Sequence, residues 1–215
     1  MYYRGFYEAE TVAAFRARLR PGATILDVGA NIGQYALIAA RAVGDDGLVV
    51  AFEPDARLRT RLIAHARRND LERRIHVLPV AVTDLPGHAG FTPATGDNRG
   101  VGRLAADGAE TVECVRLDDI WPSLGRARCD LVKLDIEGAE LPALRGAEAL
   151  LRAQRPALIV ELNTVNARGF GYRPADLVAY LAEVGYDVFP IAGARTPLRP
   201  ADAPAAANVI ALARA

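Results

Sequence analysis

The sequence has few of the residues that build disulfide frameworks or zinc sites. Its 215 residues include two cysteines, Cys114 and Cys129, and three histidines. The cysteines lie far apart, without CxxC spacing or a nearby pair of histidines, so we expect neither a disulfide nor a zinc site. We interpret both as reduced thiols in or near the core of a cytoplasmic protein.

Long apolar runs and a secretion signal are also missing. No stretch of 18 apolar residues appears, so no transmembrane helix is expected. The start, MYYRGFYEAE, lacks the pattern of basic residues followed by an apolar run that marks a signal peptide. The formal net charge is zero, which provides no broad attraction to nucleic acid or to an anionic membrane. We therefore expect a cytoplasmic protein that binds neither.

Lysine is almost absent. Of the 26 basic residues, 25 are arginine, and the single lysine is Lys133. It stands in LVKLDIEGAE (131–140), an apolar strand pattern that ends in several acidic residues. Because an ammonium differs from a guanidinium in shape and hydration, a lysine kept inside this strand hints at a specific role.

Apolar runs alternate with helical patterns along most of the chain. The runs predict strands at 23–30, 48–54, 75–82, 129–135, 156–163, 186–191 and 208–213, although Pro79 is unusual for a central strand. The helical patterns lie at 32–43, 55–68, 139–152 and 173–185. This alternation predicts an α/β fold in which a mostly parallel sheet is covered on both faces. With 51% hydrophobic residues, a single domain over residues 1–215 is expected.

The stretch DVGANIG (27–33) follows the first predicted strand and opens a helix. Gly29 and Gly33 allow a ligand to approach the backbone, but the spacing is GxxxG and not the GxGxxG of dinucleotide-binding proteins. Asp27 would repel a pyrophosphate and could hold an ammonium. Glu53 ends the second strand, where it suits the hydroxyls of a ribose. S-adenosylmethionine fits this pattern, because it has a ribose, a sulfonium, an ammonium and no phosphate. The alternative is that Asp27 and Glu53 merely cap helices.

Several motifs in order carry a family resemblance. They are GFYEAET (5–11), ATILDVGANIG (23–33), VVAFEPD (49–55), HVLPVAVTD (76–84), VECVRLDDI (112–120), DLVKLDIEGAELPALRG (130–146) and PALIVELN (156–163). In these motifs the sequence resembles class I S-adenosylmethionine-dependent methyltransferases of the FkbM type. The resemblance implies a Rossmann-like, seven-stranded sheet with an antiparallel last strand. It also implies methyl transfer to hydroxyl oxygens of sugars, lipids or polyketide-type products.

The resemblance also implies where the cofactor binds. The residues expected to hold it are Asp27, Gly29, Asn31 and Gly33 at the methionine part, Glu53 at the ribose, and Ala81 and Val82 near the adenine. One position departs from the family, which commonly has asparagine in the second helix where this chain has His65. We assign His65 no family role, because a lone helical histidine is more often structural.

The acidic residues after the fourth strand are the candidates for catalysis. Methyl transfer from a sulfonium depends on positioning the acceptor, and an alcohol must lose its proton during attack. We expect Asp135 to be the base, with Glu137 and Lys133 in support; Lys133 would keep one carboxylate ionised. For Glu137 a role at the next helix N-terminus is equally supported, and for Glu140 that structural role is favoured.

A second polar group, Glu161 and Asn163, ends the fifth strand. We expect both at the acceptor, and together with Asp135 they supply oxygen ligands of the kind that Mg²⁺ binds. The favoured alternative to a metal site is that Glu161 pairs with Lys133.

Two segments interrupt the regular alternation, an arm at 1–20 and an insertion at 84–127. The insertion holds short predicted strands at 88–93 and 110–117 around the polar loop 95–103. We expect this loop and the arm to cover the acceptor, through Asn98, Arg99, Tyr2, Tyr3 and Tyr7. A disordered surface loop is an equal alternative.

The overall prediction is an O-methyltransferase with a small hydroxylated acceptor. A nicotinamide-dependent oxidoreductase is less consistent with the sequence, which has neither GxGxxG nor a catalytic Tyr-Lys pair. A non-catalytic Rossmann-like binding domain remains open, since such a domain can keep its cofactor pocket. The acceptor's identity, methylation at oxygen rather than nitrogen, and the oligomeric state do not follow from the sequence.

Overall fold

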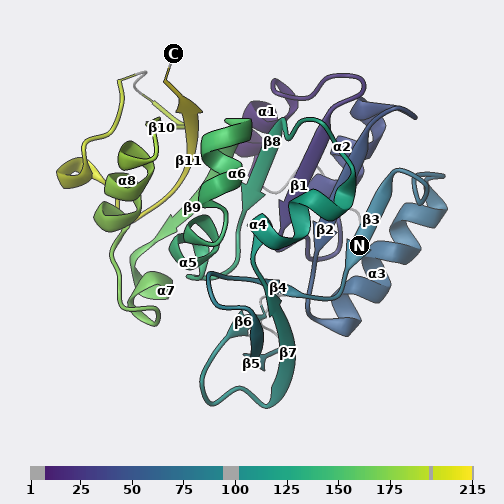
Figure 1. The fold of residues 1–215 in the computed structure, drawn as a ribbon, viewed down its shortest axis with the longest axis horizontal. Coiled ribbons are helices and arrows are strands. Elements are labelled where there is room, and N and C mark those ends of the chain that lie inside the picture. Colours follow the sequence, from purple (N-terminus) through teal and green to yellow (C-terminus); the bar gives the residue numbers. More distant parts are fainter. Residues whose placement is uncertain (1–7, 94–101, 194–195, 215) are drawn as a thin grey trace.

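A central sheet covered by helices on both faces forms the body of the protein (Figure 1). The computed structural model describes residues 8–93, 102–193 and 196–214. The seven strands lie in the spatial order β10 (Tyr186–Pro190), β11 (Ala206–Ala213), β9 (Ala157–Asn163), β8 (Leu131–Leu134), β1 (Thr24–Val28), β2 (Leu48–Phe52) and β3 (Ile75–Leu78). Strand β11 runs antiparallel to both neighbours, and the other pairs are parallel. The predicted seven-stranded sheet with an antiparallel last strand is therefore confirmed.

Successive side chains of the central strands point to opposite faces of the sheet and pack into two separate hydrophobic cores. Ile25 and Leu131 pack against the layer of α1 (Ala9–Arg16), α2 (Gln34–Val43) and α3 (Ala56–Arg68). Leu26 and Val132 point to the opposite layer, which contains α4 (Leu117–Ile120), α5 (Glu140–Arg145), α6 (Glu148–Gln154) and α8 (Pro174–Glu183). Because β1 and β8 are buried along their whole length, a polar side chain on either strand must find its partners inside the protein.

A second, smaller sheet, here called the capping sheet, lies beyond one edge of the central sheet (Figure 1). Its strands are, in spatial order, β4 (Ala81–Val82), β7 (Glu110–Val115), β5 (Gly87–Thr92) and β6 (Arg103–Leu104). The short strands predicted at 88–93 and 110–117 are confirmed as β5 and β7. The single strand predicted at 75–82 is wrong, because the chain leaves the central sheet at Pro79. Proline has no N–H to donate to a neighbouring strand, and Ala81 and Val82 pair with β7 instead.

The predicted helix 139–152 is also two helices, α5 and α6, which meet at Gly146. A Cβ placed on Gly146 would lie 2.2 Å from the carbonyl oxygen of Thr83, so the segment after β4 packs directly on this backbone. The short elements that escaped prediction include the helix α4, the strand β6, the 3₁₀ helices η1 (Trp121–Leu124) and η2 (Pro200–Asp202), and α7 (Thr164–Arg168). Within the described ranges, every helix is too short or too polar to cross a membrane.

Candidate active site

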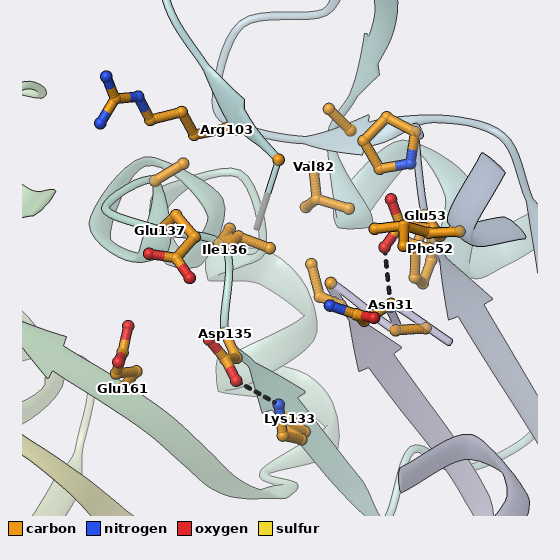
Figure 2. A pocket seen from close by; sticks show the side chains of 18 of the residues that line it. Asn31, Phe52, Glu53, Val82, Arg103, Lys133, Asp135, Ile136, Glu137 and Glu161 are labelled. Carbon is orange, nitrogen blue, oxygen red and sulfur yellow. Dashed lines mark hydrogen bonds and ion pairs between the residues drawn. The ribbon is translucent and has the colours of Figure 1, made fainter. Parts of the chain in front are cut away.

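A cavity of about 520 Å³ opens at the carboxyl ends of the parallel strands, between the central sheet and the capping sheet (Figure 2). This is the size of a small-molecule site. From the central sheet it is lined by residues that end β1, β2, β8 and β9, and from the capping sheet by Ala81, Val82, Phe91, Arg103 and Leu104. The strand ends that were expected to converge therefore line one cavity.

The loop after β1 forms part of the cavity floor. Its backbone is held by two bonds, because the amides of Gly29 and Ala30 both donate to the carbonyl oxygen of Phe52. Gly29 has a φ of +82°, and a Cβ there would lie 2.0 Å from the carbonyl oxygen of Asp135. Only glycine therefore fits where the loops after β1 and β8 touch. Gly33, which precedes α2, supports the loop from outside the cavity lining.

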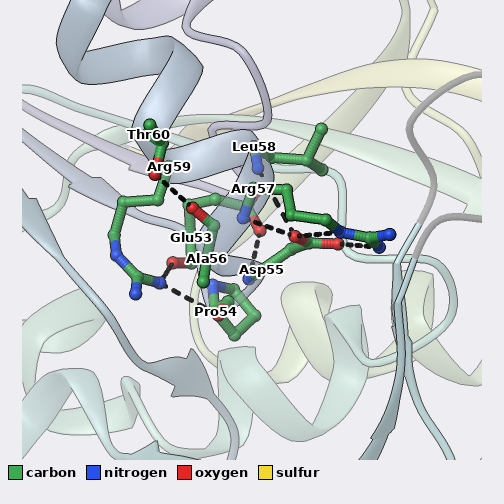
Figure 3. Close-up of polar contacts among 8 residues, drawn as sticks. All are labelled: Glu53, Pro54, Asp55, Ala56, Arg57, Leu58, Arg59 and Thr60. Carbon is green, nitrogen blue, oxygen red and sulfur yellow. Dashed lines mark hydrogen bonds and ion pairs between the residues drawn. The ribbon is translucent and has the colours of Figure 1, made fainter.

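Glu53 is a buried carboxylate at one end of the cavity. Its Oε2 accepts the amide of Asn31 at 2.7 Å, and its Oε1 accepts the amide of Asp55 at 2.8 Å (Figures 2 and 3). Burial raises the pKa of Glu53 to about 7, against these two hydrogen bonds. The carboxylate is thus oriented by backbone from two loops, and its remaining lone pairs can accept ligand hydroxyls.

The turn after Glu53 is fixed by its own charged side chains (Figure 3). Asp55 caps α3 by accepting the amides of Arg57 and Leu58, and it also pairs with the Arg57 guanidinium. Arg59 donates to the carbonyl oxygens of Glu53 and Pro54, both at 3.0 Å. These contacts hold Glu53 in place without using its carboxylate.

Lys133 is a buried cation beneath the opposite end of the cavity. Its Nζ lies 3.0 Å from Asp135 Oδ2 and 4.3 Å from the centre of the Tyr35 ring, and the residue is 3% exposed. Burial disfavours the ammonium, but the charges of Asp135 and Asp27 outweigh that effect and raise the pKa of Lys133. Lys133 was expected to pair with one of the nearby carboxylates, and in the structure that carboxylate is Asp135.

Asp27 lies beside Lys133 in the parallel register of β1 and β8. It is 1% exposed, and neither carboxylate oxygen has a hydrogen-bond partner among the described residues. Burial raises the pKa of Asp27 to about 6, although Lys133 pulls it down. Asp27 is not part of the cavity lining, so in this structure it acts on the cavity through its charge and through Lys133.

Glu137 stands in a strained turn that follows β8. Its φ is +56°, and its Oε2 accepts a hydrogen bond of 2.6 Å from the Asn166 side chain. Burial and the nearby charge of Asp135 raise the pKa of Glu137 to about 7. Glu140 has the structural role that was favoured for it, because its carboxylate accepts the amides of Ile136 and Gly138 just before α5.

Glu161 reaches the same end of the cavity from β9 (Figure 2). Its Oε2 is buried and has no hydrogen-bond partner among the described residues. Burial raises the pKa of Glu161 to about 8, and the charges of Asp135 and Glu137 add to the effect. The alternative in which Glu161 pairs with Lys133 is wrong, because Lys133 pairs with Asp135.

Asn163 does not reach the cavity. Its Oδ1 accepts the amides of Val165 and Asn166 and so caps α7. The oxygens of Asp135, Glu161 and Asn163 are therefore not presented together. In the described part of the chain, no group of three or more His, Cys, Asp and Glu residues is placed to hold a metal ion.

The lining residues that were not singled out from the sequence include Glu8, Tyr35 and Arg103. Glu8 accepts hydrogen bonds from the Tyr35 hydroxyl at 3.1 Å and from the Asn208 amide group at 3.0 Å. A tyrosine in the otherwise apolar α2 was a weak signal, whereas nothing local indicates a contact between residues 8 and 208. His65 lies outside the lining, and its Nδ1 is 2.9 Å from the Ile32 carbonyl oxygen, where it steadies the loop after β1.

The cavity brings together most of the predicted site residues. Those that line it are Gly29, Asn31, Glu53, Ala81, Val82, Lys133, Asp135, Glu137 and Glu161. Asn98, Arg99, Tyr2, Tyr3 and Tyr7, which were expected to cover the acceptor, lie outside the described residues.

This sheet order, with a cavity at the strand ends, defines the class I methyltransferase fold. The methyltransferase FkbM from Methylobacillus flagellatus KT has the same fold, with a TM-score of 0.58 and 17% identity over 93% of this chain and 50% of that one. The domain model described as Methyltransferase FkbM domain matches residues 27–188, and the chain belongs to this family.

Two curated relatives are similar in sequence. The AMB antimetabolite synthetase AmbE of Pseudomonas aeruginosa is 30% identical over 79% of this chain and 10% of the synthetase. The 2-O-methyltransferase NoeI of Sinorhizobium fredii is 29% identical over 63% of this chain and 62% of NoeI. The chain thus spans less than two thirds of the length of either relative.

Proposed function

We propose that the protein is an S-adenosylmethionine-dependent methyltransferase that methylates a hydroxyl oxygen of a small molecule. The observation that carries the proposal is the charge distribution of the cavity. A buried carboxylate suited to a ribose, Glu53, lies at one end, and a group of carboxylates lies at the other. Membership of the FkbM family supports the same function.

The lining fits a cationic cofactor better than a dinucleotide. Among the described lining residues the cations are Lys133 and Arg103, and Lys133 already pairs with Asp135. A diphosphate would therefore meet more negative than positive charge. A sulfonium and an ammonium suit this surface, so the nicotinamide-dependent alternative is disfavoured.

Each end of the cavity has a distinct task in this proposal. When bound, the cofactor supplies a methyl group activated by the sulfonium. Glu53 accepts the ribose hydroxyls, and Ala81 and Val82 provide an apolar surface for the adenine. The loop with Gly29 and Asn31 borders the methionine part, below which the charge of Asp27 favours cations. The carboxylates after β8 and β9 face the acceptor.

Two features support an oxygen acceptor. An alcohol needs a base, and the acceptor end offers several carboxylates. The relative NoeI is a 2-O-methyltransferase, which supports a hydroxyl oxygen as the acceptor. The capping sheet, which contributes Phe91, Arg103 and Leu104 to the lining, would contact the acceptor from above.

The proposal is tested by calorimetric titration with S-adenosylhomocysteine, NADH and NADPH. We expect micromolar binding of S-adenosylhomocysteine alone. Methyl transfer from labelled S-adenosylmethionine is then measured with a panel of methyl glycosides, hydroxylated lipids and macrolides, in Mg²⁺ and in EDTA. Turnover in EDTA equal to that in Mg²⁺ would assign the chemistry to side chains alone. Failure of folded protein to bind S-adenosylhomocysteine would refute the proposal and favour a non-catalytic domain.

A further inference from the structure

We propose that Glu161 is the general base of the methyl transfer, and that Asp135 remains ionised throughout in its pair with Lys133. This inference rests on the proposed function, and it moves the proton-accepting role away from the residue that the sequence favours. It follows from the contacts that each acidic residue at this end of the cavity already makes.

Asp135 is poorly placed to take a proton. Its carboxylate is the ion-pair partner of Lys133, with 3.0 Å between the charged atoms. Protonation would discharge Asp135 and leave a buried ammonium with Asp27 and Glu8 as its remaining acidic neighbours. Losing one partner of a buried pair is strongly unfavourable. Asp135 is therefore better suited to serve as a fixed negative charge near the cofactor.

Glu137 is also engaged. One of its oxygens accepts the Asn166 side chain at 2.6 Å, and its backbone stands at a φ of +56° in the turn before α5. Its carboxylate is thus held by a hydrogen bond and by a constrained backbone. A change in its protonation would weaken the contact between this turn and α7, which makes it a positioning group for that turn.

Glu161 has neither restraint. Its Oε2 is buried and has no hydrogen-bond partner among the described residues, although it lines the cavity. In the register of β8 and β9, Lys133 lies beside Ile159, two positions before Glu161. Because strand side chains alternate, Glu161 projects from the same face as Lys133, farther toward the open edge. Figure 2 shows its carboxylate on the same side of the cavity as those of Asp135 and Glu137.

The surroundings of Glu161 favour a proton on it. The acids whose charges act on it are Asp135 after β8, Glu137 in the following turn, Glu140 on α5 and Glu8 before α1. Burial and these charges raise the pKa of Glu161 to about 8. A base whose pKa lies near the working pH takes a proton effectively, provided that it is ionised when the acceptor binds. The positive charge of the cofactor would favour that ionised state.

The step balances with the groups named. The acceptor oxygen forms a bond to the methyl carbon as the carbon–sulfur bond breaks. Sulfur keeps that electron pair and becomes the neutral thioether of S-adenosylhomocysteine. The hydroxyl proton passes to Glu161, which releases it to solvent after the methylated product leaves. Asp135 and Lys133 keep their charges throughout.

The test compares Glu161→Gln, Asp135→Asn and, as a matched control, Glu183→Gln on the exposed face of α8. Affinity for S-adenosylhomocysteine is measured for each by calorimetry. With an acceptor from the panel, kcat is measured between about pH 6 and pH 9. Carboxyl titration is followed by NMR on protein labelled with ¹³C-glutamate and saturated with S-adenosylhomocysteine.

We expect Glu161→Gln to bind S-adenosylhomocysteine within about twofold of the wild type and to lose roughly 10²–10⁴-fold in kcat. The rise of kcat with pH and the highest carboxyl titration should both vanish in this variant and persist in Glu183→Gln. Asp135→Asn should weaken cofactor binding and retain the pH-dependent rise. A Glu161→Gln enzyme with near-normal kcat, or with the highest titration still present, would overturn the assignment. Those results differ from failure of the proposed function, in which the wild type itself binds no S-adenosylhomocysteine.

Discussion

Lys133 and Asp135 form an ion pair at the carboxyl end of β8, with 3.0 Å between Nζ and Oδ2. Lys133 is buried, whereas a third of the Asp135 side chain is exposed, so the pair connects the core to the cavity. On the buried side, Lys133 also neutralises part of the charge of Asp27. One lysine therefore holds two carboxylates in a sheet that would otherwise exclude them.

This arrangement predicts that Lys133→Met is strongly destabilising. The variant leaves Asp27 and Asp135 without their shared cation, which should lower the free energy of unfolding by about 3–5 kcal/mol. Urea denaturation measures the loss. The control is Arg152→Met, which breaks the exposed pair with Glu148 and should cost less than about 1 kcal/mol. Equal effects of the two substitutions would contradict the role given to Lys133.

Glu53→Gln should weaken S-adenosylhomocysteine binding by about 10–100-fold, because a charged hydrogen-bond acceptor for the ribose is lost. The amide group of glutamine would also turn a donor toward the amides of Asn31 or Asp55. Calorimetry measures the affinity, and circular dichroism checks the fold. Arg57→Gln, which alters the exposed partner of Asp55, should leave the affinity near normal. Unchanged binding by Glu53→Gln would remove Glu53 from the cofactor site.

Gly29→Ala separates steric contact from backbone strain when compared with Gly22→Ala. Both glycines have positive φ, but an added Cβ at Gly22 meets nothing within 4 Å, while at Gly29 it would lie 2.0 Å from a carbonyl oxygen. Backbone strain alone should lower the free energy of unfolding of Gly22→Ala by about 1–2 kcal/mol, as measured by urea denaturation. In Gly29→Ala, overpacking should lower the free energy of unfolding by about a further 1–3 kcal/mol. This variant should also bind S-adenosylhomocysteine poorly. Similar losses in both variants would mean that the two loops separate easily.

The stability of the ligand-free protein should fall as the pH rises from about 5 to 8. Burial raises the pKa of Asp27 to about 6 and that of Glu161 to about 8. In this range the folded state binds more protons than the unfolded state. The stabilisation that protonated Asp27 and Glu161 provide is therefore present at low pH and is lost as the pH rises through their folded-state pKa values. Melting temperatures measure the trend. Asp27→Asn with Glu161→Gln should make it shallower without abolishing it, because the pKa values of Glu53 and Glu137 are also raised, each to about 7. A wild-type curve already flat over this range would disprove the raised pKa values.

Much of the sheet could be predicted, because alternating apolar runs and helical patterns leave few arrangements for a parallel sheet. The cavity carboxylates Glu53, Asp135 and Glu161 could be predicted for a related reason. Each stands at the carboxyl end of a buried strand, and those ends meet at one edge.

Other features depend on information that local sequence does not contain. Pro79 indicates that the strand predicted at 75–82 is interrupted, because proline is unusual in a central strand. Only the pairing of Ala81 and Val82 with β7 shows where the chain continues. Glu8 contacts Asn208 across 200 positions of sequence. The sequence favours Asp135 as the base and places Glu161 only at the acceptor. Their difference is a matter of which carboxylate receives Lys133, and that contact forms only in the folded protein.

The departure of the chain from the central sheet at Pro79 divides the cavity lining between two separate sheets. The residues proposed for the cofactor belong mainly to strand ends of a rigid, doubly covered sheet, where change is costly. The residues proposed to face the acceptor from above belong to β5 and β6, at the outer edge of the capping sheet. Changes in the length or the side chains of that edge can therefore alter the acceptor surface while the proposed cofactor pocket below stays intact. A change of acceptor specificity would then arise from substitutions in β5 and β6.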